Sequence, residues 1–514
     1  MVKRNNRWLL VLLVLVIAGF FRFYRITSIP PGLYPDEAMN GNNALEAIAT
    51  GNYKVFYPEN NGREGLFINI QAQSVKIFGN EPWALRIVSG IFGVLTVLGT
   101  YFLASKLFNW QIGLFSSFFL ATSFWHTLFS RIGFRAISAP FFMVWGLYFL
   151  WRGLSSSKLW NFGVSGILFG LGFYTYISFR AMPLVVILAL LSYWATIKKD
   201  FSHEKYIHTR NQIIKGLALL LILFIFIFLP LGYYFYANPG DFLGRTTQVS
   251  IFTSDDAVKT LTTNTIRTLG MFNFIGDYNW RHNFSGAPEL IWPVGILFIF
   301  GFFRSWIKLF KNWKKQGHPS TTQILLLSWF FVGLLPVILS VEGIPHALRA
   351  IMVAPVVFIF AGEGLWWLYD MLKDWYVKRD FHEINIYKRK YSEGTFVATL
   401  AMVIFMAACM IIEYDRYFYQ WTLNSNVPPN YSQNYVDLGN LLNILPQSIK
   451  KYVVVNANGT LVNDIPMPAQ TIMFITDTWT LQKQKAKNLY YLTEERFDQK
   501  KYDEDSFVIP LEPE

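Results

Sequence analysis

Two adjacent carboxylates, Asp36 and Glu37, follow a Pro/Gly-rich stretch in the segment "IPPGLYPDEAMNG". Only 33 of the 514 residues are Asp or Glu, so an acid pair just after the first apolar stretch is unusual for this chain. A carboxylate can take a proton from an attacking hydroxyl when geometry and pKa permit. Alternatively, Asp36 is an N-cap residue that opens a helix at "EAMNG". The local sequence leaves both interpretations open.

Three later segments place arginine at turns between apolar runs, and they read "FWHTLFSRIGFRAISAP", "YTYISFRAMP" and "EGIPHALRAIM". The guanidinium group offers a planar fork of donors that suits phosphate. Taken singly, each arginine could be an anchor at the membrane interface. Taken together, the segments predict an anion site of a lipid headgroup, built from Arg131, Arg135, Arg180, His346 and Arg349, with His126 and Tyr176 as further candidates for substrate contact.

Two more polar segments carry residue types that could contact a substrate. "GDYNWRHNFSGAP" contains Asp277, Arg281 and His282, and "FYPENNGREGLF" contains Arg63 and Glu64. A loop held by its own turn chemistry and a local ion pair are the alternatives for these two segments. Walker A, GxGxxG and HExxH motifs are absent from the sequence, so nucleotide-driven transport has no support in this chain.

The composition is that of a membrane protein. The chain is 53% hydrophobic and 15% charged, and its mean hydropathy is +0.30. The formal net charge of +12 comes from short basic clusters between apolar runs, a pattern typical of cytoplasmic loops rather than of nucleic-acid binding. Cys409 is the single cysteine, which excludes an intrachain disulfide and a cysteine metal site. The basic, apolar N-terminal stretch lacks a small-residue cleavage site, so we expect an uncleaved first span.

Hydropathy predicts about eleven transmembrane helices, since a span needs about 20 mostly apolar residues. The expected spans are 7–26, 82–104, 111–128, 136–151, 160–176, 181–196, 213–236, 288–305, 321–340, 347–369 and 395–412. With this number of spans, four basic clusters fall on one face, which the positive-inside rule makes cytoplasmic. The clusters contain Lys3, Arg4 and Arg7; Lys198, Lys199, Lys205, Arg210 and Lys215; Arg304, Lys308, Lys311, Lys314 and Lys315; and Lys378, Arg379, Lys388, Arg389 and Lys390. We therefore expect a cytoplasmic N-terminus and an extracytoplasmic tail.

The opposite face carries the larger segments, which are about 27–81, about 237–287 and the tail from Glu413. "LFINIQAQSVKIF" has apolar residues at helical spacing and predicts an amphipathic helix on the membrane surface. In the tail, "YVVVN", "TIMFIT", "NLYYL" and "FVIPL" predict short strands, and "NYVDLGNLLNIL" predicts a helix before them. The expected fold is an all-α polytopic membrane protein over residues 1–412 and a small α/β domain over residues 413–514.

These blocks resemble a known family. The stretch from "LYPDEAMNGNNALEAIATGNY" to "TYFLASKLF" is similar to the first outer loop and second span of the GT-C glycosyltransferases. "HTLFSRIGFRA", "YTYISFR", "GDYNWRHNFSGAP" and "PHALRA" are similar to blocks of bacterial glycosyltransferase family 39, which is related to protein O-mannosyltransferases and lipid A aminoarabinose transferases. The resemblance covers about residues 1–412. One departure is Gly65, where relatives usually have Pro.

The resemblance implies a cell-membrane enzyme that takes a sugar from a polyprenyl-phosphate donor. It would transfer that sugar to an acceptor hydroxyl on the extracytoplasmic face, with inversion at the anomeric carbon. The acceptor is a protein, a lipid or a glycan. Asp36 would be the general base, and Glu37 would position the acceptor or a divalent metal ion. The resemblance assigns the arginines and His346 to the donor phosphate.

Two other classes of function remain. A transporter or lipid flippase would need charged or broken-helix sites near the bilayer midplane and two matching halves. A non-catalytic scaffold would make the tail the active part. Both alternatives predict that loss of the Asp36 carboxylate leaves function largely intact.

Overall fold

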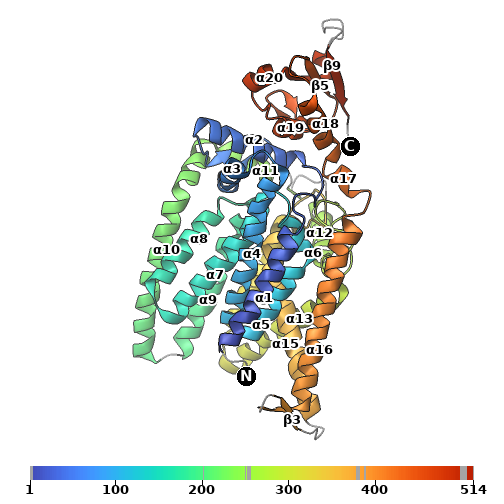
Figure 1. Cartoon of the computed structure of the whole chain (residues 1–514). Helices are drawn as coiled ribbons and strands as arrows, with labels where there is room; N and C mark the ends of the chain where they lie inside the picture. Colours follow the sequence, from blue (N-terminus) through green and yellow to red (C-terminus); the bar gives the residue numbers. More distant parts are fainter. Residues whose placement is uncertain are drawn as a thin grey trace.

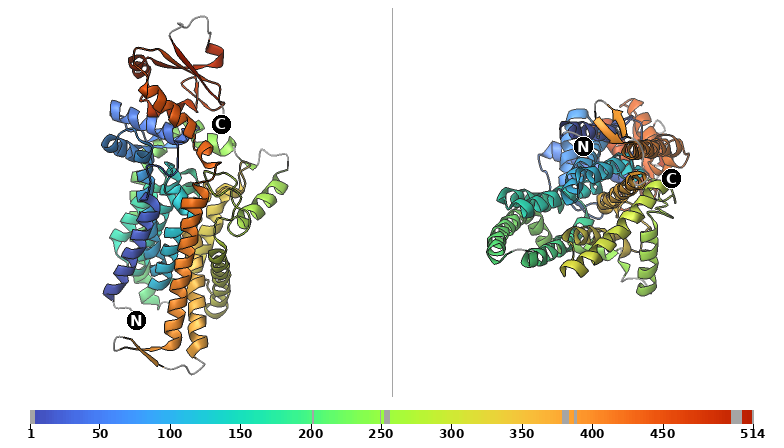
Figure 2. Two further views of the ribbon diagram at one scale, coloured as in Figure 1. Left: turned by 45° about the vertical axis from the view of Figure 1, so that its right-hand side comes forward. Right: turned by 90° about the horizontal axis from the view of Figure 1, so that it is seen from below.

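The chain folds into a bundle of long helices with a small α/β unit at one end (Figure 1). This computed structural model describes residues 4–200, 202–248, 250–251, 256–377, 383–386, 389–497 and 506–512. The start of α1 and the β3–β4 hairpin (Glu383–Ile386 and Arg389–Ser392) lie at the lower end, and the C-terminal unit lies at the upper end (Figures 1 and 2). Lys3, Lys378, Arg379 and Lys388 of the predicted basic clusters lie outside the described residues.

Each predicted span overlaps a helix of the bundle. The helices are α1 (Arg4–Phe23), α4 (Pro82–Leu107), α5 (Trp110–Thr122) with the short α6 (Phe124–Phe129), α7 (Ser138–Ser156), α8 (Leu159–Gly172), α9 (Met182–Asp200), α10 (His203–Ala237), α13 (Trp292–Gln316), α14 (Thr321–Ile338), α15 (Ala354–Val377) and α16 (Glu393–Asp415). Within the described residues, seven helical segments are long and apolar enough to cross a membrane. The multi-pass architecture is therefore confirmed, whereas the predicted number of eleven spans is not.

Local chemistry sets several helix boundaries. Pro lies in the first turn of α4 and of α13. A backbone N–H at this position would have no acceptor within the helix, so proline costs no hydrogen bond there. The side chain of Asn109 caps α5 by accepting a hydrogen bond from the Ile112 amide at 2.9 Å. Gly317 ends α13 with φ +69°, which a glycine adopts at little cost. These signals divide a nearly continuous apolar sequence into separate helices.

The first long segment forms α2 (Pro35–Thr50), the antiparallel pair β1 (Phe56–Tyr57) and β2 (Arg63–Glu64), and α3 (Gly65–Phe78). The predicted amphipathic helix is thus confirmed as α3, and its residue Ile77 is 72% exposed. The second long segment contains α11 (Pro239–Gln248) and α12 (Ala257–Gly270). Figure 1 places α2, α3 and α11 at the end of the bundle that carries the C-terminal unit.

The C-terminal unit is a small α/β structure, as predicted. It contains α17 (Val427–Asn430), α18 (Gln433–Ile444), β5 (Lys451–Val455), the hairpin of β6 (Leu461–Val462) and β7 (Ile465–Pro466), α19 (Ala469–Ile475), α20 (Leu481–Lys487), β8 (Leu489–Thr493) and β9 (Phe507–Leu511). A parallel sheet has the strand order β8-β5-β9. α16 continues to Asp415 and then into a π-helical turn, without a break at residue 412. The two-domain division stays a prediction.

The predicted strand "TIMFIT" is wrong, because this segment is the core of helix α19. A short apolar run that is buried on all sides has no periodicity to separate a strand from a helix. Residues 469–474 are all buried here, because one side of α19 packs on the small domain and another packs on α2. Tertiary contact therefore overrides the β propensity of Thr and Ile in this run.

α19 and α2 are joined by polar and apolar contacts. The Asn42 side-chain amide donates to the backbone oxygen of Gln470 at 3.1 Å and to its side-chain oxygen at 2.8 Å. The Thr471 hydroxyl donates to the Leu33 carbonyl at 2.9 Å. Phe474 is fully buried in an apolar cluster shared with Leu33. Helix α19, in the last part of the chain, thus packs against α2 and the residues before it and stabilises their position.

Gly41 of α2 lies against the ring of Phe474 in α19. A methyl group at this position would lie 2.5 Å from the ring of Phe474. We expect Gly41→Ala to lower the free energy of unfolding by about 1–3 kcal/mol through overpacking. Thermal unfolding of the detergent-solubilised protein measures this change. Gly19→Ala in α1 is the control, because its Cβ meets nothing within 4 Å. Equal stability of the two variants would contradict the interface.

Candidate active site

A cavity of about 600 Å³ gathers residues from segments that are far apart in the sequence. Its walls come from α2, the β1–β2 loop, the turns before α7 and α9, α11, the end of α14 and the turn before α15. Its charged and phenolic lining residues are Asp36, Arg63, Glu64, Arg135, Tyr176, Arg180, Asp241 and Arg349. Of the residues singled out in the sequence, the cavity thus brings together Asp36, Arg63 and Glu64 of the first loop, Tyr176, and one arginine from each of three turns.

The two adjacent carboxylates point in different directions, because neighbouring residues on a helix are about 100° apart. Asp36 lies in the first turn of α2 and lines the cavity. Asn60 donates a hydrogen bond to its Oδ1 at 2.6 Å, and none of the described residues donates to Oδ2. The N-cap of α2 is Tyr34, so the alternative interpretation of Asp36 as an N-cap is wrong.

Glu37 faces the protein interior and does not line the cavity. It is fully buried, and its two oxygens accept hydrogen bonds from Arg86 Nη2 at 3.1 Å and Nε at 3.0 Å. The Gly133 amide donates a third bond at 2.6 Å. Arg86 also donates to the carbonyls of Pro30 and Gly32. Glu37 therefore ties α2 to α4 and to the turn before α7, and its oxygens are occupied.

Arg63 is a buried cation beside Asp36. It is 3% exposed, and its Nη1 and Nη2 donate to the side-chain oxygens of Asn40 at 2.7 Å and Asn43 at 2.5 Å. Burial, followed by the positive charge of Arg135, lowers the pKa of Arg63 to about 10, so the group stays charged at neutral pH. Its direct side-chain partners are neutral amides. This arrangement leaves positive charge in the cavity wall for an anion to balance.

Glu64 holds two further arginines in the same wall. Its Oε2 accepts from Arg135 Nε at 2.8 Å, and its Oε1 lies 3.7 Å from Arg180 Nη2. Arg135 lies over the Tyr176 ring, 5.5 Å from its centroid, and Arg180 donates to the Phe242 carbonyl at 2.8 Å. These contacts fix the direction of both guanidinium groups, which reduces the entropy lost when an anion binds.

Arg349 enters the cavity from the side of α14. Its guanidinium group donates to the Ser340 hydroxyl and to Glu342, whose Oε2 is 3.2 Å away. Because the Glu342 carboxylate is 61% exposed, this ion pair is screened by water. Arg349 therefore adds a further positive charge to the cavity lining, beside those of Arg63, Arg135 and Arg180.

Gly65 fixes the geometry of the first loop directly after Arg63 and Glu64. The Gly65 amide donates to the Val55 carbonyl at 2.9 Å, a bond that proline could not form. A Cβ at this position would lie 2.0 Å from the Lys54 carbonyl oxygen. This close approach places β2, which contains Arg63 and Glu64, against the backbone of Lys54 and Val55.

Arg131 and His126, two of the predicted site residues, are buried away from the cavity. Arg131 is fully buried and donates to the carbonyls of Phe21, Tyr24 and Ile29, which fixes the chain where it leaves α1. His126 is also fully buried, and its Nδ1 contacts Arg22 at 2.7 Å. These contacts are structural, and neither side chain faces the cavity.

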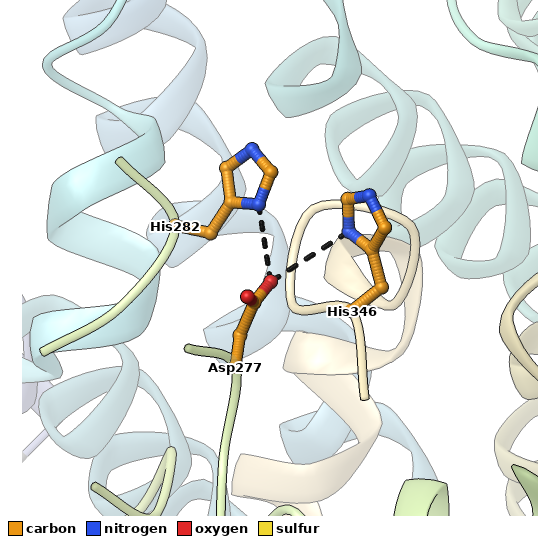
Figure 3. A group of neighbouring side chains, drawn as sticks. All are labelled: Asp277, His282 and His346. Atoms are coloured by element: carbon orange, nitrogen blue, oxygen red, sulfur yellow. Dashed lines mark hydrogen bonds and ion pairs between the residues drawn. The ribbon is translucent and has the colours of Figure 1, made fainter. Parts of the chain in front are cut away.

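Asp277, His282 and His346 form a separate group next to the cavity (Figure 3). His282 Nδ1 and His346 Nδ1 lie 3.0 and 3.7 Å from Asp277 Oδ2. Arg281, from the same loop, lies over the ring of Tyr34, with its Cζ 3.6 Å from the ring centroid. This loop therefore reaches the N-terminal end of α2, directly before Asp36.

Sequence reasoning missed the residues that hold the charged groups in place. Asn40 and Asn43 lie four and seven positions after Asp36, so helical spacing puts all three on one face of α2. Arg86, the partner of Glu37, is 49 residues away in the sequence, and no local pattern connects them.

Glu289 is another residue that sequence reasoning missed. It is fully buried, and its side chain accepts a hydrogen bond from the Asp277 amide at 3.1 Å. Burial and the negative charge of Asp277 raise the pKa of Glu289 well above its usual range.

The family model described as "Dolichyl-phosphate-mannose-protein mannosyltransferase" matches residues 66–234 of the chain. The match includes Arg135 and Arg180 and ends short of Asp36 on its N-terminal side. No curated protein matches the sequence.

Solved structures share the fold at low sequence identity. The oligosaccharyltransferase AglB from Archaeoglobus fulgidus, in complex with an inhibitory peptide and a dolichol-phosphate, has a TM-score of 0.56 and 12% identity. That similarity covers 92% of this chain and 64% of AglB, so the chain spans less than two thirds of that protein. ArnT from Cupriavidus metallidurans, bound to undecaprenyl phosphate, has a TM-score of 0.54 and 15% identity, and the similarity covers 93% of this chain and 85% of ArnT.

The Glu37–Arg86 pair generates a prediction about stability. We expect Glu37→Gln to cost about 3–5 kcal/mol of unfolding free energy, because it leaves a buried guanidinium without its counter-charge. Arg86→Met should cost a similar amount, and the double variant should cost much less than the sum. Unfolding of the four proteins in detergent measures the coupling. Additive costs would contradict a direct pair, and Asp36→Asn is the neighbouring control, with stability close to wild type.

Proposed function

We propose that this chain, a polytopic membrane protein with the fold of the GT-C glycosyltransferases, transfers a sugar from a polyprenyl-phosphate donor to an acceptor hydroxyl. The observation that carries the proposal is the cavity in which the Asp36 carboxylate faces a wall of arginines. The complexes of AglB with a dolichol-phosphate and of ArnT with undecaprenyl phosphate support a lipid-phosphate ligand. The positive-inside rule supports an extracytoplasmic site, with a cytoplasmic N-terminus.

Asp36 is the general base in this mechanism. Its Oδ2 takes the proton of the acceptor hydroxyl as the acceptor oxygen attacks the anomeric carbon. Asn60 holds the other oxygen at 2.6 Å and so fixes the direction of the carboxylate. The new bond forms on the face of the sugar opposite the phosphate, and the bond between the anomeric carbon and the phosphate oxygen breaks. The anomeric configuration is inverted, as in other single-displacement sugar chemistry.

The arginines stabilise the leaving group. The electron pair of the broken bond stays on the phosphate oxygen, so negative charge grows there in the transition state. Arg63, Arg135, Arg180 and Arg349 line the cavity with donors that are already oriented by their neighbours. Preoriented cations stabilise developing charge without the cost of reorganisation.

Glu37 and Arg131 do not contact the substrate in this mechanism; they hold the segments that position Asp36. Glu37 holds α2 against α4 and so sets the position of Asp36, one residue away. Arg131 holds the chain after α1, from which the segment before α2 continues. The cavity-lining Glu64 and Tyr176 position Arg135.

Sugar transfer in proteoliposomes tests the proposal. Purified protein is supplied with a panel of polyprenyl-phosphate sugars and hydroxyl acceptors, and released polyprenyl phosphate is measured. We expect Asp36→Asn to lower kcat at least about 100-fold, because the acceptor loses its general base. Asp464→Asn, at an exposed position of the C-terminal unit, is the matched control and should retain full activity.

Normal turnover by Asp36→Asn would overturn the assignment of the base. Movement of intact lipid across the bilayer without release of lipid phosphate would instead indicate a transporter or flippase.

Binding of the phosphate generates a separate prediction. We expect Arg135→Gln and Arg180→Gln each to weaken the affinity for polyprenyl phosphate at least about 10-fold, which is about 1.4 kcal/mol. Arg135→Lys should fall between Arg135→Gln and wild type, since lysine keeps the charge but loses the forked geometry. Quenching of tryptophan fluorescence by the lipid measures the affinity. Arg267→Gln on the exposed face of α12 is the control, and equal affinity in all four variants would contradict the phosphate site.

A further inference from the structure

Three ligand-type side chains meet outside the proposed catalytic cavity. Asp277 and His282 come from the loop between α12 and α13, and His346 comes from the turn between α14 and α15. Figure 3 shows both imidazole rings turned with Nδ1 toward the Asp277 carboxylate. The candidate ligand atoms of the three residues all lie within 4.8 Å of one another.

The distances fit a small divalent cation. Zn²⁺ binds imidazole nitrogen and carboxylate oxygen at about 2.0–2.2 Å, so two ligand atoms of a tetrahedral site lie roughly 3.3 Å apart. The His282 Nδ1 to Asp277 Oδ2 distance is 3.0 Å, and the His346 Nδ1 to Asp277 Oδ2 distance is 3.7 Å. These values bracket the spacing of a tetrahedral site, so small side-chain movements would suffice for coordination.

Backbone groups already orient the carboxylate. The Asn279 amide donates to Asp277 Oδ1 at 2.8 Å, and the Ala347 amide donates to Oδ2 at 2.9 Å. Hydrogen bonds from the backbone to a metal-binding carboxylate hold its side chain in the orientation that coordination needs. The two imidazole rings stack with centroids 4.8 Å apart and an interplanar angle of 25°, and each ring directs its Nδ1 toward the Asp277 carboxylate. The group is therefore built before a cation arrives.

Burial and donor type select the cation. Asp277 is 4% exposed and His282 is 7% exposed, so a bound ion would be largely shielded from water. Two imidazoles and one carboxylate suit Zn²⁺, whereas Mg²⁺ and Ca²⁺ prefer oxygen ligands. Three protein ligands leave a fourth position of a tetrahedral site for water or for a substrate oxygen.

We propose that Asp277, His282 and His346 bind one Zn²⁺ ion that joins the α12–α13 loop to the turn before α15. This site is separate from Asp36 and Glu37, where the sequence placed a metal if one is present. Leu348 and Arg349, two and three residues after His346, line the catalytic cavity. The ion would thus fix one wall of that cavity, and its binding does not depend on the proposed transferase reaction.

Metal binding by the full-length protein tests the site. The protein is purified in detergent with an affinity tag that lacks histidine, stripped with a chelator and equilibrated with buffered Zn²⁺. We expect one Zn²⁺ per chain by mass spectrometry of the metal content. His282→Gln and His346→Gln should each weaken Zn²⁺ affinity at least about 10-fold in competition with a chromophoric chelator. His208→Gln, at an exposed histidine of α10, is the matched control and should bind as wild type does.

Two further measurements keep the test decisive if a variant fails to fold. Co²⁺ added to the stripped wild-type protein should give the visible absorption bands of a four-coordinate site. His346→Cys should keep one ion per chain and add a sulfur-to-cobalt band in the near ultraviolet. A wild-type protein that binds no Zn²⁺ and shows no Co²⁺ bands would overturn the proposal and leave an Asp–His ion pair. Full Zn²⁺ affinity in both folded glutamine variants would overturn it as well.

Discussion

The buried ion pair of Glu37 and Arg86 is the constraint on which the site depends. It joins α2 to α4, and Arg86 reaches from the same position to the carbonyls of the Pro30–Gly32 turn that leads into α2. A buried pair of this kind is retained only when further hydrogen bonds satisfy both partners, and Gly133 supplies such a bond to Glu37. Because α2 is held rigidly on this face, its other face can present Asp36 and Asn40 to the cavity. Glu37 of the acid pair is thus held in structural contacts, and Asp36 is the proposed general base.

The arginines that line the cavity differ in how far a nearby carboxylate compensates their positive charge. Glu64 compensates Arg135 and Arg180 directly, whereas Arg63 is held by neutral amides and Arg349 by a largely exposed carboxylate. A site with full compensation would have little affinity for an anion, and one with none would be costly to fold. The intermediate arrangement suits a ligand whose negative charge grows during the reaction. It also explains why three acids and four arginines can line one small space.

Much of the architecture could be predicted from the sequence, because hydropathy locates helices and turn residues locate their ends. The strands of the C-terminal sheet and the helix α3 were predicted for the same reason, since their local patterns match their surroundings. Long-range contacts could not be predicted in this way. The "TIMFIT" segment is a helix because α2 covers it, and Arg131 and His126 turn inward to partners about 100 residues away. Arg135, Arg180 and Arg349, which come from three turns, line the cavity with Asp36, and their roles there stay predictions.

The support of α2 by the last part of the chain has a consequence for biogenesis. Asn42 and Gln470 are 428 positions apart, so α2 is synthesised long before its partner. Gly32 adopts φ +61° against the backbone of Tyr431, which also arrives late. During translation the helices of the bundle can therefore form while the segment that carries Asp36 still lacks its contacts with α19. The last part of the chain completes these contacts, and a truncated chain would lack the support of α2.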